Sequence, residues 1–93
     1  MQQYSNTAVN ADGLNFSLYF SKIATSITNS AELCCADCFH NIINNCYLYD
    51  YDQITQTCVQ YTEKTSLSSY QLQLYSINYY VTKPNHASGI YYG

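Results

Sequence analysis

The sequence predicts an α+β fold, in which a single helix packs across an antiparallel β-sheet. Three observations predict it: several segments alternate apolar and polar residues, one segment has helical periodicity, and five cysteines are present. The chain makes one domain, residues 1–93, because a second would have too little apolar surface to bury. Much of the apolar content is tyrosine, which is often only half buried, so the hydrophobic core is small. A domain with a small core usually needs covalent cross-links such as disulfides.

Strands are expected where apolar and polar residues alternate. The clearest case begins at Leu14, where every second side chain as far as Phe20 is large and apolar. The expected strands are 14–27, 46–52, 57–62 and 69–81. The second and third form a hairpin, because the four residues between them suit a short connection. The residues Lys83-Pro84-Asn85 end the last strand, because proline has no backbone N–H to donate.

One helix is expected between the first strand and the hairpin. Asn29 followed by Glu32 is a capping-box pattern, in which the first side chain accepts from N–H groups of the first turn. The helix therefore begins at Ser30 or Ala31 and runs to about His40.

The cysteines have the most informative spacing. Cys34 and Cys38 share one face of the expected helix, Cys46 opens the first hairpin strand, and Cys58 lies in the second. With Tyr49-Asp-Tyr51-Asp52 after Cys46 and Val59 after Cys58, this framework resembles the PAN/apple domain family. The resemblance implies two nested disulfides, Cys34–Cys58 and Cys38–Cys46, which staple the helix to the hairpin. The further bridge that ties the termini of apple-type members together is absent.

Cys35 is the odd cysteine, and three fates stay open for it. It is a buried thiol that behaves as a small hydrophobe, it links two subunits, or it pairs in place of Cys34. Cys35-Ala-Asp-Cys38 also matches a C-x-x-C redox motif, but such pairs act at a helix N-terminus and this one lies mid-helix. Adjacent cysteines with one trailing ligand also lack the paired spacing of structural zinc sites, so no metal is expected.

No pattern of catalytic residues is present, and we expect neither an enzyme nor a cofactor. His40 falls at the helix C-terminus, where a cation is favoured, and His86 falls in a polar loop. Asp50 and Asp52 share one side of their strand, but acids beside a hairpin turn usually form the turn.

Charge and cysteine content restrict the environment and the partners. Three lysines and no arginine cannot build a phosphate-binding surface, so nucleic acid is excluded. A short, cysteine-rich chain is typical of secreted proteins, and Asn15-Phe16-Ser17 offers a glycosylation site at Asn15. Met1–Tyr4 has no leader character, so we expect a leader to have been removed. No apolar run is long enough to span a bilayer.

The tyrosines suggest a binding face. If Cys46 points at the helix, alternation places Leu48 on the helix side and Tyr47, Tyr49 and Tyr51 on the other. Tyr61 and Tyr75 extend this row. The alternative is that the N-terminal segment or the C-terminal tail covers the row as core.

Two functions follow from these expectations. The first is an extracellular structural or adhesive subunit that binds copies of itself in a fibre, coat or matrix. Because charged residues are scarce, little electrostatic repulsion opposes such self-association. Residues 1–13 and 84–93 then dock on neighbouring subunits. The second is a lectin-like module that binds extracellular glycan or protein through the tyrosine-rich face.

Overall fold

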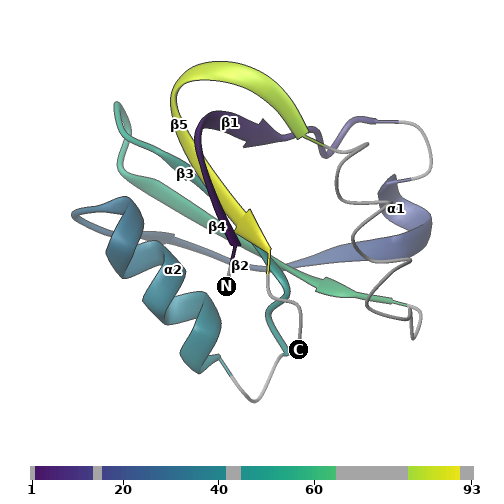
Figure 1. Ribbon diagram of the computed structural model, residues 1–93. Helices are drawn as coiled ribbons and strands as arrows, with labels where there is room; N and C mark the ends of the chain where they lie inside the picture. The colour runs from purple at the N-terminus through teal and green to yellow at the C-terminus, as the bar shows by residue number, and fades with distance from the viewer. Residues whose placement is uncertain (1, 14–15, 42–44, 65–79, 91–93) are drawn as a thin grey trace.

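A computed structural model describes residues 2–13, 16–41, 45–64 and 80–90 (Figure 1). Its elements, in chain order, are β1 (Gln2–Val9), α1 (Phe16–Tyr19), β2 (Phe20–Ile27), α2 (Ala31–His40), β3 (Leu48–Asp52), β4 (Thr57–Glu63) and β5 (Tyr80–Ile90). The strands form one antiparallel sheet in the order β1-β5-β3-β4-β2, and α2 packs on β3, β4 and β5. The predicted α+β class is confirmed.

Helix α2 has the predicted bounds, but its cap is one residue later than expected. Ser30 is the N-cap, and its hydroxyl accepts the N–H of Leu33 at 3.2 Å. Because the cap is Ser30 and not Asn29, Glu32 is too early to complete a capping box. At the other end, the N–H of Asn41 donates to the carbonyl of Cys38 at 3.2 Å and closes the last turn.

The predicted hairpin is present as β3 and β4, paired from Leu48↔Tyr61 to Asp52↔Thr57. The Asp52 carboxylate shapes the turn by accepting the N–H groups of Ile54 and Thr55, at 2.9 and 3.4 Å. Asp52 therefore has the turn-forming role predicted for it. The strand begins at Leu48, two residues after Cys46.

The predicted strand at 14–27 is wrong for Phe16–Tyr19, which form the single turn of α1. Residues four apart share a side in a helix as they do in a strand, but only the helical turn brings Phe16 and Phe20 together, with ring centroids 5.2 Å apart. Leu18 distinguishes the two, because a strand buries it with the two phenylalanines. Here it is 61% exposed.

The strand β5 continues through Pro84, where we expected it to end. Tyr80–Thr82 pair with β1, and His86–Ile90 pair with β3, while Lys83, Pro84 and Asn85 belong to neither ladder. The missing N–H of Pro84 therefore costs no ladder bond. Asn85 takes a left-handed φ of 64°, and its carbonyl accepts the N–H of Gln53 at 2.9 Å.

The two segments expected to dock on neighbouring subunits lie in the chain's own sheet, as far as the structure describes them. Residues 2–9 are the edge strand β1, and residues 86–90 are the half of β5 that lies between β1 and β3. Figure 1 shows β1 and the start of β5 curving away together from the rest of the sheet.

Buried side chains form two clusters, one on each face of the sheet. Under α2 lie the five cysteines with two tyrosines of β3: Cys34, Cys35, Cys38, Cys46, Cys58, Tyr49 and Tyr51. The opposite cluster, which α1 and the end of β1 help to cover, consists of Val9, Phe16, Phe20, Leu48, Tyr61 and Ile90. Alternation along β3 thus supplies both clusters.

Candidate functional site

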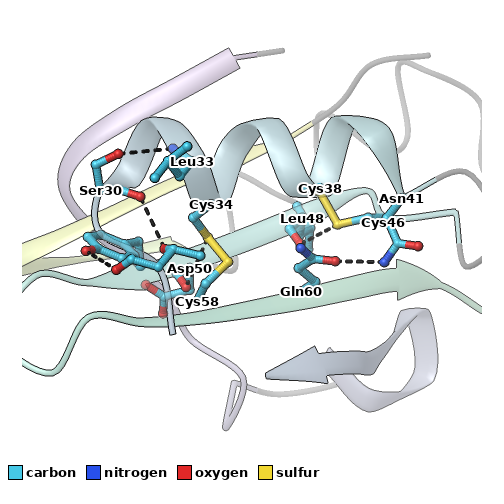
Figure 2. Close-up of a disulfide and its surroundings, with 12 residues drawn as sticks. Ser30, Leu33, Cys34, Cys38, Asn41, Cys46, Leu48, Asp50, Cys58 and Gln60 are labelled. Atoms are coloured by element: carbon cyan, nitrogen blue, oxygen red, sulfur yellow. Dashed lines mark hydrogen bonds between the residues drawn. A yellow bond between two sulfur atoms is a disulfide. The ribbon is translucent and has the colours of Figure 1, made fainter. Parts of the chain in front are cut away.

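Two disulfides fix α2 on the sheet, and Figure 2 shows them side by side. Cys34 is bonded to Cys58 in β4, with Cα atoms 5.6 Å apart. Cys38 is bonded to Cys46, just before β3, with Cα atoms 5.2 Å apart. These are the pairs that the PAN/apple resemblance implied. Each closes a loop of the unfolded chain and so stabilises the fold by about 2–4 kcal/mol.

Hydrogen bonds hold the two ends of α2 as well. Near its C-terminus, the Asn41 amide donates to Gln60 Oε1 of β4 at 2.8 Å, and Gln60 is buried (Figure 2). Before its N-terminus, the Tyr51 hydroxyl donates to the carbonyl of Thr28 at 2.9 Å. Disulfides and hydrogen bonds together therefore hold α2 in one position on the sheet.

The predicted tyrosine face is not an exposed surface. Tyr49 and Tyr51 are 0% and 2% exposed, because α2 covers them. Tyr61 is buried in the opposite cluster, edge-on to Phe16 at 5.3 Å, and Tyr47 packs partly buried against the same cluster. Tyr75 lies outside the described residues, as does the predicted glycosylation site Asn15.

The prediction of a binding face is therefore wrong for Tyr49, Tyr51 and Tyr61. It took Cys46 as the strand residue that points at the helix. Because Cys46 precedes β3, its bridge reaches α2 without setting which side the later residues face. The alternative of a row buried as core describes these tyrosines, although α2 is the cover for two of them.

Cys35 is a buried thiol outside both bridges, so it does not pair in place of Cys34, which is bonded to Cys58. The Gln3 side chain of β1 donates from Nε2 to Cys35 Sγ at 3.3 Å. Burial raises the pKa of the neighbouring Tyr49 hydroxyl well above its ordinary value, and Cys35 raises it further. Tyr49 therefore stays neutral in the physiological range.

His86 lies between two carboxylates of β3. Its Nδ1 is 3.0 Å from Asp50 Oδ1, and its Nε2 is 3.7 Å from Asp52 Oδ2. Burial raises the pKa of Asp50, although its hydrogen bond to His86 acts in the opposite direction. The N–H of Ile54 lowers the pKa of Asp52. The three side chains line a shallow hollow of about 260 Å³ with Thr55, Thr57 and Val59.

This arrangement ties two strands together. His86 of β5 and Asp50 of β3 lie within hydrogen-bond distance of one another, so their contact links the two neighbouring strands. No local sequence pattern predicts this pairing, because His86 and Asp50 are 36 residues apart. The shared side of Asp50 and Asp52 was the available signal, but nothing local placed His86 opposite them.

A second hollow, of about 300 Å³, lies at the C-terminal end of α2. Its lining combines aromatic rings with amides, namely Phe39, Asn41, Asn45 and Tyr47. Phe39 is 54% exposed. An exposed ring beside two amides provides an apolar platform together with hydrogen-bonding groups.

The outermost strands of the described sheet are β1 and β2. The ladder from β2 to β4 is irregular between Lys22 and Ala24, and then regular from Ala24↔Gln60 to Ile27↔Thr57. That regular half, Ala24–Ile27, contains no charge and no proline. Ile27 at its end is 69% exposed. Natural edge strands usually carry charges, prolines or bulges that prevent pairing with other chains, and this half has none.

Within the described ranges, no group of three or more His, Cys, Asp or Glu side chains is placed to hold a metal ion. No helix among these residues is long and apolar enough to cross a membrane. No protein-family model matches the chain, and no curated protein matches it.

Proposed function

We propose that the chain is an extracellular, non-catalytic module of the PAN/apple type that assembles with copies of itself into a fibre, coat or matrix. Two disulfides support an oxidising environment, since such bridges persist mainly outside the cytosol. Their nesting between one helix and one hairpin supports the PAN/apple resemblance. A charged fraction of only 10% keeps the electrostatic cost of self-association small.

The proposal depends on the regular half of the edge strand β2, Ala24–Ile27. Thr25, Ser26 and Ile27 are exposed, and their strand pairs on one side only, with β4, among the described residues. A second copy adds its own β2 antiparallel to this edge, which satisfies the outward backbone groups of both strands. The contact is two-fold symmetric, so each Ile27 side chain is removed from water by the same contact.

Charge is compatible with this contact. Lys22 is the single charged residue of β2, and it lies on the far side of the ladder irregularity from Ala24–Ile27. An antiparallel pair of regular halves therefore brings no like charges face to face. The contact joins two five-stranded sheets edge to edge.

The test is to place a charge in the middle of this edge. Thr25→Lys puts two lysines near the two-fold axis, where like charges on neighbouring strands repel. We expect sedimentation velocity to show self-association of the oxidised wild type, and an apparent dissociation constant about tenfold higher for Thr25→Lys, which is a change of about 1.4 kcal/mol. Gln53→Lys, at an exposed turn position, is the matched control and should behave as the wild type. A monomeric wild type, or equal effects of the two lysines, would disprove the proposal.

Glycan binding is the second candidate, and the hollow at the end of α2 favours it. Phe39 offers a face for a sugar ring, while Asn41 and Asn45 lie within reach of hydroxyl groups. We expect Phe39→Ala to abolish any signal of the oxidised protein on a glycan array. Leu33→Ala changes another exposed apolar residue of α2 and should leave the signal unchanged. A silent array for the wild type removes this candidate.

A further inference from the structure

The edge strand β1 is attached to the domain differently from the rest of the sheet. Both disulfides join α2 to the hairpin region, and neither involves β1. Among the described strands, β1 forms its ladder with β5 alone. Among the side chains described in β1, those of residues 3–9, only Ala8 and Val9 at the C-terminal end are buried. One ladder and a few side-chain contacts therefore hold the strand.

That ladder is also interrupted in the middle. The register is regular from Gln2↔Ile90 to Ser5↔Ala87 and again from Thr7↔Thr82 to Val9↔Tyr80. Between the two halves, Asn6 of β1 takes a left-handed φ of 51°. On the β5 side, the three residues Lys83, Pro84 and Asn85 have no partner in β1. Two short ladders separate more readily than one continuous ladder, because each opens with fewer hydrogen bonds broken at once.

The connection from β1 to the body is a surface turn. The N–H of Gly13 donates to the carbonyl of Asn10 at 3.0 Å, and Ala11 and Asp12 within the turn are exposed. Phe16, a few residues later, is anchored in the cluster with Phe20 and Tyr61. Opening this turn releases β1 while Phe16 holds the rest of the chain in place.

From these features we infer that β1 exchanges between copies: β1 of each subunit leaves its own β5 and pairs with β5 of a partner, reciprocally. In the exchanged pair, β1 of the partner makes the same contacts with β5 and α2 that β1 of the same chain makes before exchange. These include the Tyr4–Tyr80 ring contact at 5.1 Å and the Gln3 bond to Cys35. Exchange therefore needs no new complementary surface, and the cost is confined to opening the turn.

This inference rests on the proposed self-association and completes it. A two-fold contact between β2 strands closes after one step and gives only a dimer. β1 lies at the opposite edge of the sheet from β2 (Figure 1). Reciprocal exchange of β1 supplies a second two-fold contact there, so that the two contacts alternate along an open chain of subunits. A fibre needs such a pair of contacts.

An engineered disulfide across the β1–β5 ladder tests the exchange. Thr7 and Thr82 are directly paired, and opposite residues of an antiparallel ladder lie close enough for a disulfide. When assembled Thr7→Cys/Thr82→Cys protein is oxidised, we expect a band of twice the monomer mass on a non-reducing gel, and its loss in reductant. Ser21→Cys/Thr62→Cys places the same pair across β2 and β4, which do not exchange, and should give monomer only.

The outcomes separate this inference from the proposed function. Oligomers by sedimentation, together with a monomer band for the fully oxidised Thr7→Cys/Thr82→Cys protein, would overturn the exchange and leave the β2 contact standing. Monomers by sedimentation would overturn both. A dimer band in the wild type points to Cys35 instead, so the variant's dimer must persist when Cys35→Ser is added. Its disappearance in that background would also overturn the exchange.

Discussion

Helix α2 packs on the sheet and strand β1 forms one edge of it, but the two are held in different ways. Two disulfides, the Asn41–Gln60 bond and the Tyr51–Thr28 bond fix α2 at both ends. Strand β1 depends on a ladder that is broken at Asn6. A covalent tie limits the unfolded and partly open states of the segment that it joins, and a ladder at an edge does not. The molecule therefore has a fixed body, α2 with the β3–β4 hairpin, and an edge strand, β1, which we call the exchangeable edge.

The largest effect is expected from removing the longer bridge of the fixed body. Cys34→Ala/Cys58→Ala opens a loop with a sequence separation of 24. We expect the free energy of unfolding to fall by about 3 kcal/mol in urea titrations, on the loop-entropy account. Cys38→Ala/Cys46→Ala, with a separation of 8, should cost about 1 kcal/mol less. The reverse order would show that the loops do not determine how α2 is held.

The fixed body is also the part that the sequence predicts best, because its signals are local. The spacing of Cys34 and Cys38, the helix 31–40 and the hairpin turn at Asp52 all depend on residues close in the chain. The resemblance to PAN/apple domains added the pairing of the cysteines.

The rest of the fold depended on information that no short segment carries. Alternation from Phe16 to Phe20 fits a helical turn as well as a strand, and the side on which Tyr49 lies depends on where β3 begins. The position of β5 in the sheet depends on contacts with β1 and β3, which are far from it in the sequence. The contact between His86 and Asp50 forms because β5 pairs with β3.

Two carboxylates on β3 should respond to pH in opposite directions, although they are only two residues apart. The folded-state pKa of Asp50 is raised by burial, so its contribution to stability is full below the ordinary pKa of 3.8 and is lost as pH rises through the folded value. The folded-state pKa of Asp52 is lowered by the Ile54 N–H, so its contribution is present above 3.8 and is lost as pH falls.

The pair of variants Asp50→Asn and Asp52→Asn measures this contrast. Between about pH 3 and 5, the range in which aspartate titrates, the stability of wild type minus Asp50→Asn should fall as pH rises. The same difference for Asp52→Asn should rise. His86, Lys83 and Tyr61 surround position 50 in the wild type and in both variants, so each variant serves as the control for the other. Parallel slopes in urea titrations would contradict the assigned environments.

The smallest expected effect lies where the exchangeable edge touches the fixed body. Gln3 of β1 donates to the Cys35 thiol, which is 8% exposed, so a reagent reaches the sulfur after β1 moves away. A hydrogen bond of this kind contributes about 0.5–1.5 kcal/mol. Gln3→Ala should therefore speed alkylation of Cys35 between about twofold and tenfold, followed by mass spectrometry. Ser5→Ala, at an exposed position of the same strand, should leave the rate unchanged.

The Thr7→Cys/Thr82→Cys bridge then locates the motion that admits the reagent. If β1 must leave β5 before Cys35 reacts, closing this bridge slows alkylation in the Gln3→Ala background, because the strand can no longer separate. If alkylation stays as fast with the bridge closed, Cys35 is reached by movement of α2 instead. In that case the fixed body opens before the edge, and the distinction between α2 and β1 is reversed.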